Sequence, residues 1–370
     1  MHRTFAIVER ELRRFRRSPM LIVMSMIFPL LQLIVLGYAF GGNVKHLKLA
    51  VVDQDHGLPA VRIRELAGAV SSGARTLDLT EYADPGQALA DLRNGVVNGV
   101  LEIPPDFSRR SLTDQQPRVA LVSDNTDTFV SATLAATVSS VVGAFNTPVR
   151  VERVSSAAVV DVVEVYPYVP YIQYLLPGSI TMSIFMMVMI GGGIIFIDDK
   201  ARGLHEGYLV TPITKLELVA GFNISGTIKA VLAGIVITVI GSLIAGVPNP
   251  LDPVRLLRML IVITLTAFAL ISLMFLLMVR VTDPLLPRAI FGVLNTVLYF
   301  PSGAVYPQAG FPSWMQAIAA VDPFTYAVHA FKSLLLKNTG FDAIAFDILF
   351  LFIFSTVAMT AATALFKRTL

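Results

Sequence analysis

The chain has 370 residues, of which 55% are hydrophobic and 15% are charged, with a net charge of +3 and a mean hydropathy of +0.69. Because soluble chains carry about 25% charged residues, this composition excludes an ordinary soluble domain and indicates a membrane protein. The basic residues are not gathered on one soluble domain, which argues against nucleic-acid binding. Cysteine is absent, so disulfides and thiolate metal sites are excluded.

Residues 1–18 are predicted to form a cytoplasmic amphipathic helix at the membrane interface. Phe5, Val8, Leu12 and Phe15 recur at helical spacing, with arginines and glutamates on the other side. Such a helix lies with its apolar side in the membrane surface and its arginines toward anionic headgroups. A solvated basic leader is the alternative interpretation.

The apolar segments predict an α-helical polytopic membrane protein with about six spans, since a helix needs roughly 20 apolar residues to cross the bilayer core. Residues 19–42 contain the first span, which is expected to be an uncleaved anchor because no A-x-A-type cleavage site follows it. Residues 171–370 are expected to form a five-span domain. One of its spans is short and broken by Pro301 and Gly303, which predicts a re-entrant segment over about 301–326. The apolar windows are 19–40, 174–197, 219–246, 256–279, 287–305 and 344–366.

The lysines and arginines predict that both termini face the cytoplasm, because inside segments carry an excess of these residues. The short outside loops hold only Arg255, Arg258, Lys332 and Lys337. The inside segments hold Arg3, Arg10, Arg13, Arg14, Arg16, Arg17, Lys200, Arg202, Lys215, Arg280, Arg288, Lys367 and Arg368.

Residues 43–170, between the first two spans, are long and polar enough to form a separate extracytoplasmic domain. Strand and helix patterns alternate along them, which predicts a small α/β fold. Predicted strands are 47–53, 76–82, 97–103 and 118–123, and predicted helices are 60–71, 85–94, 104–112 and 127–145, the last capped by Asp127 with Val130, Leu134, Val138, Val141 and Phe145 on one face.

Motifs of catalysis are missing from the sequence. It contains no G-x-x-x-x-G-K-[ST] loop to hold nucleotide phosphates. His205 and Glu206 begin like a zinc-binding H-E-x-x-H, but Leu209 stands where the second histidine is needed. We therefore expect no enzymatic activity and no bound cofactor or metal in this chain. Any active transport would need an energy-supplying activity in another subunit.

Lys229 is a candidate functional residue, because it lies about ten residues into the third predicted span, where a lysine is costly. It is expected to face a polar cavity, a carboxylate or freed carbonyls, and Asn223 precedes it on the same helix. The alternative is that its side chain reaches the cytoplasmic headgroups. Small residues at 191–193, Ala230, Gly234 and Gly292 predict close helix contacts.

Several segments resemble type-2 ABC exporter permeases, in particular the subfamily with a large extracytoplasmic domain between spans one and two. These segments are the loop 198–215, the stretch from Pro301 to Pro307, and 311–326 with Asp322-Pro-Phe-Thr-Tyr326. In the insert, 50–55, 94–107 and 123–125 are similar to that subfamily's domain. The family's Gly-Thr-x-Glu pattern is matched by Gly203 and Glu206, with Leu204 in place of threonine, and Lys332 stands where the later motif often ends in arginine.

The resemblance implies the transmembrane permease subunit of an ATP-driven exporter, and the expected location is the bacterial cytoplasmic (inner) membrane. Two permease copies, as a homodimer or a close heterodimer, would bind two cytoplasmic ABC ATPase subunits, which hold the ATP and Mg²⁺. Loop 198–215 is then the expected ATPase-coupling loop; an ordinary hairpin connection is the alternative. The residues singled out are Gly203, Glu206, Gly207, Tyr208, Thr211 and Pro212 in this loop, and Pro301, Gly303, Pro307, Pro312, Pro323 and Tyr326 in the re-entrant motif.

The expected cargo is a hydrophobic or amphipathic compound such as a drug or a lipid. We expect the domain at 43–170 to guide this cargo or to bind an outer partner such as a periplasmic adaptor; a lid without a recognition role is the alternative. Three other functions stay open: a non-transporting membrane scaffold or receptor with an exposed recognition domain, an ABC-linked mechanical transducer, and an intramembrane enzyme. Transducers typically have four spans, fewer than expected here. A neighbouring gene for an ATPase would favour the transporter over the scaffold.

Overall fold

The computed structural model describes residues 2–41, 46–73, 76–113, 116–124, 128–146, 169–194, 199, 211–279, 281, 283 and 286–366. Within it the chain divides into two compact units. The first, here called the membrane unit, combines Met1–Gly41 with Val163–Leu370, and the second, the insert unit, is Gly42–Val162.

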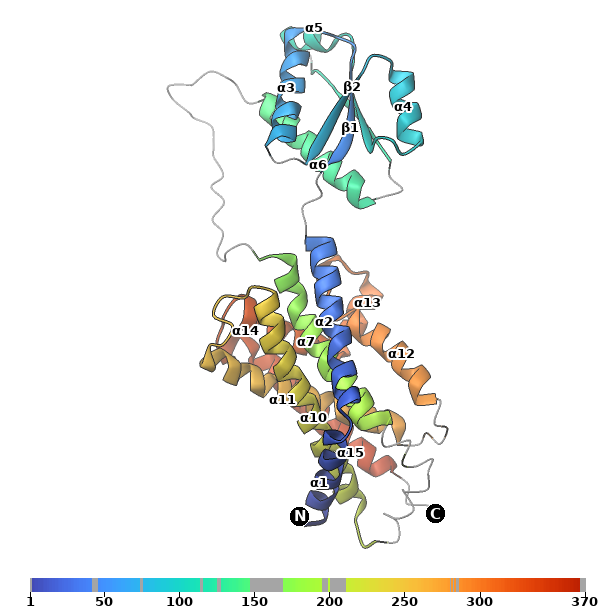
Figure 1. The fold of residues 1–370 in the computed structure, drawn as a ribbon, viewed down its shortest axis with the longest axis vertical. Coiled ribbons are helices and arrows are strands. Elements are labelled where there is room, and N and C mark those ends of the chain that lie inside the picture. The colour runs from blue at the N-terminus through green and yellow to red at the C-terminus, as the bar shows by residue number, and fades with distance from the viewer. Residues whose placement is uncertain are drawn as a thin grey trace. The chain divides into compact units, whose positions relative to one another are not determined.

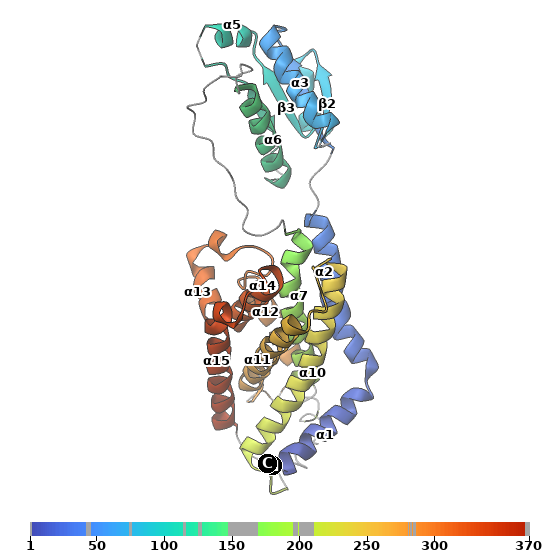
Figure 2. The same ribbon diagram turned by 90° about the vertical axis from the view of Figure 1, so that its left-hand side faces the viewer.

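The membrane unit is a bundle of helices (Figures 1 and 2). Among the described residues, five helices are long and apolar enough to cross a membrane: Ile22–Ala39, Tyr171–Gly193, Lys215–Ile244, Pro253–Met278 and Phe341–Leu365. Its elements are α1 (His2–Arg16), α2 (Pro19–Gly41), α7 (Tyr171–Val188), η1 (Met189–Ile194), α10 (Lys215–Ile244), α11 (Pro253–Met278), α12 (Leu286–Tyr299), η2 (Gln308–Gly310), α13 (Ser313–Val321), α14 (Pro323–Leu336), η3 (Phe341–Ile344) and α15 (Ala345–Leu365).

The sixth predicted span corresponds to α12, which has 14 residues. At 1.5 Å per residue, a helix of that length is about 21 Å long and does not cross a hydrocarbon core of about 30 Å by itself. The helix ends at Tyr299, just before Pro301, and is followed by the turn, α13 and α14. Within the described residues, five of the six predicted spans are therefore found as membrane-long helices, and the sixth is replaced by a shorter apolar helix followed by a turn.

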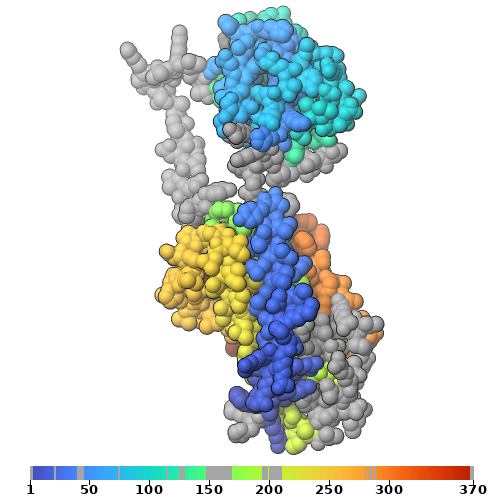
Figure 3. Space-filling model, viewed as in Figure 1, coloured from blue at the N-terminus to red at the C-terminus, as the bar shows by residue number. Residues whose placement is uncertain are grey.

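Helix α2 exposes a row of large apolar side chains on the surface of the membrane unit, where it is drawn in blue in Figure 3. Its inner side is different, since Leu33 is fully buried. A helix that is apolar all round, with one side on protein and the other uncovered, is suited to lipid contact. The exposed residues include Met20, Val23, Met24, Phe28, Leu31 and Val35.

The orientation predicted for α1 is partly wrong. The helix forms, but it turns Ile7, Val8, Glu11 and Phe15 toward the rest of the membrane unit, and Phe5 is 71% exposed. Ile7 packs where α10 has Gly221; a Cβ on that glycine would lie 2.9 Å from Ile7 Cβ. The sequence pattern placed the glutamates on the polar side, whereas Glu11 lies on the buried side because it has a cationic partner there.

Small residues allow close helix packing at most of the predicted positions. A Cβ on Gly234 would lie 2.7 Å from Ile263 Cγ2 of α11, and one on Gly193 would lie 2.9 Å from the Phe291 ring of α12. Ala230 is fully buried. The prediction for Gly292 is wrong within the described chain, because a Cβ there would meet nothing within 4 Å.

The insert unit is a four-stranded sheet in the order β2-β1-β3-β4, with helices on both faces (Figure 1). The β1–β2 and β1–β3 pairs are parallel and the β3–β4 pair is antiparallel. Along β1, Leu47 and Leu49 contribute to one apolar cluster, while Ala50 and Val52 contribute to another. This alternation is the two-residue period of a strand covered on both faces.

Each strand and helix predicted in the insert is confirmed, with shifts of a few residues at the ends. The face predicted for α6 is also confirmed, since Leu134, Val138 and Val141 are buried in one cluster, with Val130 and Phe145 packed against it. Asp127, its predicted cap, lies outside the described residues. The elements are β1 (Leu47–Asp53), α3 (Leu58–Ser72), β2 (Leu77–Tyr82), α4 (Pro85–Arg93), β3 (Gly99–Ile103), α5 (Phe107–Leu112), β4 (Ala120–Ser123) and α6 (Thr128–Asn146).

Candidate functional site

Lys229 lies on α10, whose start is fixed by a capping box. Thr214 accepts a hydrogen bond from Glu217 N at 3.2 Å, and Glu217 Oε2 accepts one from Thr214 N at 2.9 Å. This reciprocal bonding satisfies two of the amides that a helix leaves free at its N-terminus. The helix then continues without a break past Lys229, whose side chain is 0% exposed.

The Lys229 ammonium has two strong acceptors. Its Nζ lies 2.9 Å from Glu11 Oε2 and donates to the Gly191 carbonyl at 2.8 Å. Gly191 lies in η1, where the chain forms a π-helical turn at the end of α7. Such turns alter the α-helical bonding pattern and are frequent at functional sites. The headgroup alternative for Lys229 is therefore wrong, because its charge is held inside the protein.

A chain of ion pairs continues from Glu11. Arg10 Nη1 lies 3.4 Å from Glu11 Oε1, and Arg10 Nη2 lies 2.9 Å from Asp199 Oδ2. Arg14 Nη1 lies 2.6 Å from the other Asp199 oxygen. Glu11 and Asp199 are each 1% exposed. Since a buried charge is tolerated only when it is paired, these groups depend on one another. We call Lys229, Glu11, Arg10, Arg14 and Asp199 the charge chain.

Helix α1 is bonded to both ends of the predicted coupling loop. Asp199 is the second residue of the 198–215 segment, and Arg10 and Arg14 bind it. Near the other end, the Arg3 guanidinium donates a hydrogen bond to the Pro212 carbonyl. Thr211 and Pro212 form a turn immediately before the α10 cap. The loop residues Gly203, Glu206, Gly207 and Tyr208 lie outside the described part of the chain.

Asn223 does not join the charge chain. Its Nδ2 donates to the Val219 carbonyl at 2.9 Å, and its Oδ1 accepts a hydrogen bond from Ser272 Oγ of α11 at 3.0 Å. Asn223 is fully buried. Its polar group therefore fixes the contact between α10 and α11.

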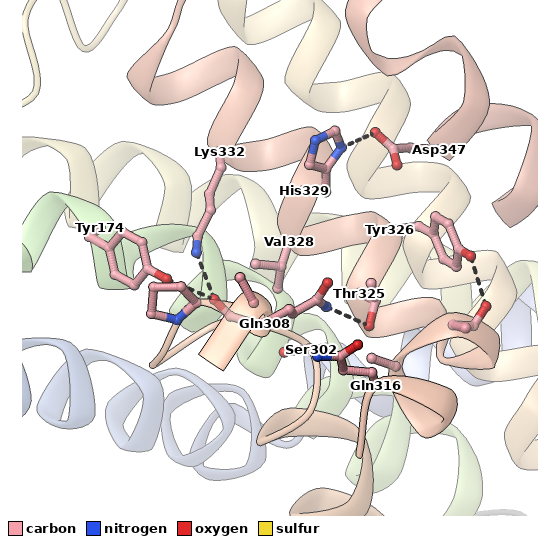
Figure 4. A pocket seen from close by; sticks show the side chains of 15 residues that line it. Tyr174, Ser302, Gln308, Gln316, Thr325, Tyr326, Val328, His329, Lys332 and Asp347 are labelled. Carbon is pink, nitrogen blue, oxygen red and sulfur yellow. Dashed lines mark hydrogen bonds and ion pairs between the residues drawn. The ribbon is translucent and has the colours of Figure 1, made fainter. Parts of the chain in front are cut away.

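The re-entrant motif forms a second cluster, shown in Figure 4. Gly303 has a φ of +81°, a conformation that side chains disfavour, and this turn directs its carbonyl toward α14. Lys332 Nζ donates to that carbonyl at 2.6 Å, and the Tyr174 hydroxyl donates to it at 3.3 Å. The same ammonium lies 3.6 Å from the centroid of the Tyr174 ring.

The other motif residues have distinct positions. Pro307 and Tyr326 line a cavity beside this cluster, and the Pro301 carbonyl accepts a hydrogen bond from Gln308 at 3.2 Å. Pro312 precedes α13 and Pro323 begins α14, positions where the missing amide of proline costs nothing. The motif thus builds two short helices and the turn that joins them to α12.

Sequence analysis missed Glu11, Asp199, His329 and Asp347 as members of sites. His329 Nδ1 lies 2.8 Å from Asp347 Oδ2. Two of the acidic residues carried a usable signal: Glu11 interrupts an apolar helix face, and Asp347 lies within an apolar window. Asp199 carried none. Among the residues that the structure describes, no three His, Cys, Asp or Glu side chains are grouped as metal ligands would be.

Comparison with known proteins gives two findings. Residues 19–364 match the family model described as ABC-2 family transporter protein. The chain is also similar to the probable multidrug ABC transporter permease YbhR of Escherichia coli, from strain K12 and from O157:H7. It is 21% identical to each of them over 373 residues, and each alignment covers 99% of this chain and 99% of the relative. Because the family model spans nearly the whole chain and the helices are apolar and long enough to cross a membrane several times, this multi-pass membrane protein belongs to the ABC-2 family of transporter permeases.

Proposed function

We propose that the chain is the permease subunit of an exporter that moves hydrophobic or amphipathic compounds out of the cytoplasm or the inner leaflet. A separate ABC ATPase would supply the energy by docking on loop 198–215, and a second permease copy would complete the pathway. Family membership supports the ABC partnership, and the name of the E. coli relative, a probable multidrug ABC transporter permease, supports the cargo class.

The charge chain is the observation that carries this proposal. It runs from Asp199, at the start of the loop, through α1 to Lys229 inside α10. Because Arg3 also bonds the Pro212 carbonyl, displacement of the loop would move α1 with it. The Glu11–Lys229 pair would then transmit this displacement to α10 and, through Gly191, to the end of α7. The role is positional and needs no proton transfer.

The sidedness belongs to the same proposal. With both termini in the cytoplasm of a bacterial cell, α1 and loop 198–215 lie on the side where an ATPase has access to ATP. The insert unit then lies outside the membrane, where it would receive cargo or contact a periplasmic adaptor. The positive-inside distribution of lysine and arginine supports this orientation.

Site-directed crosslinking tests the docking surface. The chain lacks cysteine, so single cysteines at Glu206 or Gly207 give one thiol each without background. We expect them to crosslink to the ATPase subunit in the assembled complex. Leu251→Cys is the matched control, because residue 251 is exposed and lies in a loop predicted to be on the opposite side. Crosslinking at 251 with none anywhere in 198–215 would refute the proposed docking site and orientation.

Transport is tested with the same complex in liposomes. We expect the wild-type permease with its ATPase to export a fluorescent amphipathic dye, and the pair Glu11→Gln with Lys229→Met to lose the stimulation of ATP hydrolysis by the dye. An intact complex that hydrolyses ATP but moves no dye, drug or lipid would support the scaffold or transducer alternatives.

A further inference from the structure

A cavity of about 720 Å³ lies between the re-entrant segment, α14 and α15 (Figure 4). Its volume is within the range of small-molecule sites. Most of the apolar side chains that line it are small, so they leave room for a ligand. Pro307, Ala309, Ala319, Ala320 and Val328 form this apolar lining, and Lys332, His329, Asp347, Gln308 and Gln316 supply polar groups.

Lys332 is the distinctive group in this cavity. Among the described residues its ammonium is paired with no carboxylate: its neighbours are the Gly303 carbonyl and the Tyr174 ring. An ammonium has three donors, of which the carbonyl takes one. Asp347, the acidic residue in the lining, lies 2.8 Å from His329 Nδ1 instead. The cavity therefore contains a partly buried cation that has no anionic partner in the part of the chain that the structure describes.

An aromatic row leads from the cavity along α15. The Tyr326 ring, in the cavity lining, stacks on Phe350 with 3.7 Å between centroids, and Phe350 stacks on Phe354 at 6.0 Å. Phe346, 5.8 Å from Tyr326, is 68% exposed. An apolar path that begins at a cationic cavity and continues on an exposed apolar helix fits a molecule with an anionic head and a hydrocarbon tail.

We propose that this cavity binds the anionic headgroup of an amphiphile, with Lys332 as its counter-ion and the hydrocarbon chain along the aromatic row of α15. The shared ligand chemistry is a phosphate or carboxylate on an alkyl chain, whether it comes from a membrane lipid or from an exported compound. The site is separate from the charge chain and does not require ATP hydrolysis.

A fluorescence experiment on the full-length permease tests the site. Gln316→Cys, in this cysteine-free chain, carries a bimane label at the cavity, and the protein is placed in nanodiscs. Dibrominated phosphatidylglycerol and dibrominated phosphatidylcholine are compared as quenchers. One cation near a headgroup is worth about fivefold in affinity, so we expect about a fivefold preference for the anionic lipid. A second arm uses discs of dibrominated phosphatidylcholine. Dodecyl phosphate is expected to displace brominated lipid from the cavity and so relieve the quenching of the label. Dodecyltrimethylammonium is the matched cationic compound.

Variants distinguish binding in the cavity from a general electrostatic attraction of anionic lipid to the protein. Lys332→Gln should abolish the preference, whereas Lys332→Arg, which keeps the charge and a donor for the Gly303 carbonyl, should retain it. Lys337→Gln is the matched control, because Lys337 is exposed, ends the same helix and does not line the cavity. Displacement by dodecyl phosphate without a lipid preference identifies an exported compound as the source, and a lipid preference identifies a membrane lipid.

Equal quenching by both lipids together with no displacement by dodecyl phosphate would overturn the proposal. Preferential displacement by dodecyltrimethylammonium would also overturn it, since that result would assign the cavity to cations. Either failure leaves the proposed transport function intact, because binding is measured without the ATPase.

Discussion

Lys229→Met is expected to leave the Glu11 carboxylate buried without its closest cation. The two groups are 2.9 Å apart, and their side chains are 0% and 1% exposed. Loss of one partner from a buried pair costs about 3–5 kcal/mol. Arg10 Nη1 remains 3.4 Å from Glu11 Oε1 and offsets part of this loss. We therefore expect a destabilisation at the lower end of this range, about 3 kcal/mol.

The double variant Glu11→Gln/Lys229→Met should be more stable than Lys229→Met alone. It removes both buried charges, and replacement of a whole buried pair is often nearly neutral. The Gly191 carbonyl still loses its lysine donor, which costs about 1 kcal/mol. Lys229→Met should therefore be about 2 kcal/mol less stable than the double variant, measured by unfolding the purified permease in an SDS titration. Because Glu11→Gln alone leaves the buried Lys229 ammonium without its carboxylate, the full double-mutant cycle should give a coupling energy larger than about 2 kcal/mol.

The neighbouring surface pair Glu9–Arg13 is the matched control. Its atoms are 2.6 Å apart on the same helix, but the side chains are 50% and 75% exposed, so the cycle there should give no more than about 0.5 kcal/mol. A Glu11–Lys229 coupling energy as small as that would refute the interaction. A stable double variant with full ATPase stimulation would show that the pair has no part in transmission.

Three further outcomes follow from other parts of the chain. Gly234→Leu should cost about 1–3 kcal/mol through overpacking, since a Cβ there would lie 2.7 Å from Ile263 Cγ2. Gly292→Leu should be nearly neutral. Equal thermal stabilities of the two variants would contradict this packing. Thr214→Ala should cost about 1 kcal/mol by removing the α10 capping box. Its melting temperature should be lower than that of Thr264→Ala, whose hydroxyl donates to the Leu260 carbonyl of its own helix. The insert, expressed alone as 43–170, gives a pH test at Asp55. Burial disfavours its carboxylate, but hydrogen bonds from Ser108 and Gly57 outweigh this effect and lower its pKa below 3.8. The resulting contribution to stability is fully present above pH 3.8 and is lost as the pH falls through the lowered pKa, so the melting-temperature advantage over Asp55→Asn should be constant near neutral pH and shrink as the pH is lowered below 3.8.

Most of the secondary structure followed from the sequence because its signals are local. Apolar windows of sufficient length marked five helices, and the alternation of strand and helix patterns marked the sheet of the insert. The short α12 was harder, because the length and the break at Pro301 and Gly303 indicate an interruption without fixing where the chain goes next.

The candidate sites depended on contacts between distant segments. Lys229 stood out because a lysine inside an apolar helix is costly, so its need for a partner was predictable. The identity of the partner was not, since Glu11 is 218 positions away. Similarly, the residue pattern of α1 predicted its two faces, but Glu11 lies on the buried side, where it pairs with Lys229, and Phe5 is exposed.

The class of molecule, its family and the apolar helices long enough to cross a membrane could be predicted from the sequence, because these depend on hydrophobic length, periodicity and motifs along the chain. Which charges meet depends on the tertiary structure. Only the approach of α1 to α10, permitted by Gly221, and the π-helical turn at Gly191 bring a carboxylate and a carbonyl to Lys229. Only the left-handed turn at Gly303 brings its carbonyl to Lys332. Such pairings depend on where helices lie in space, which no local pattern of residues specifies.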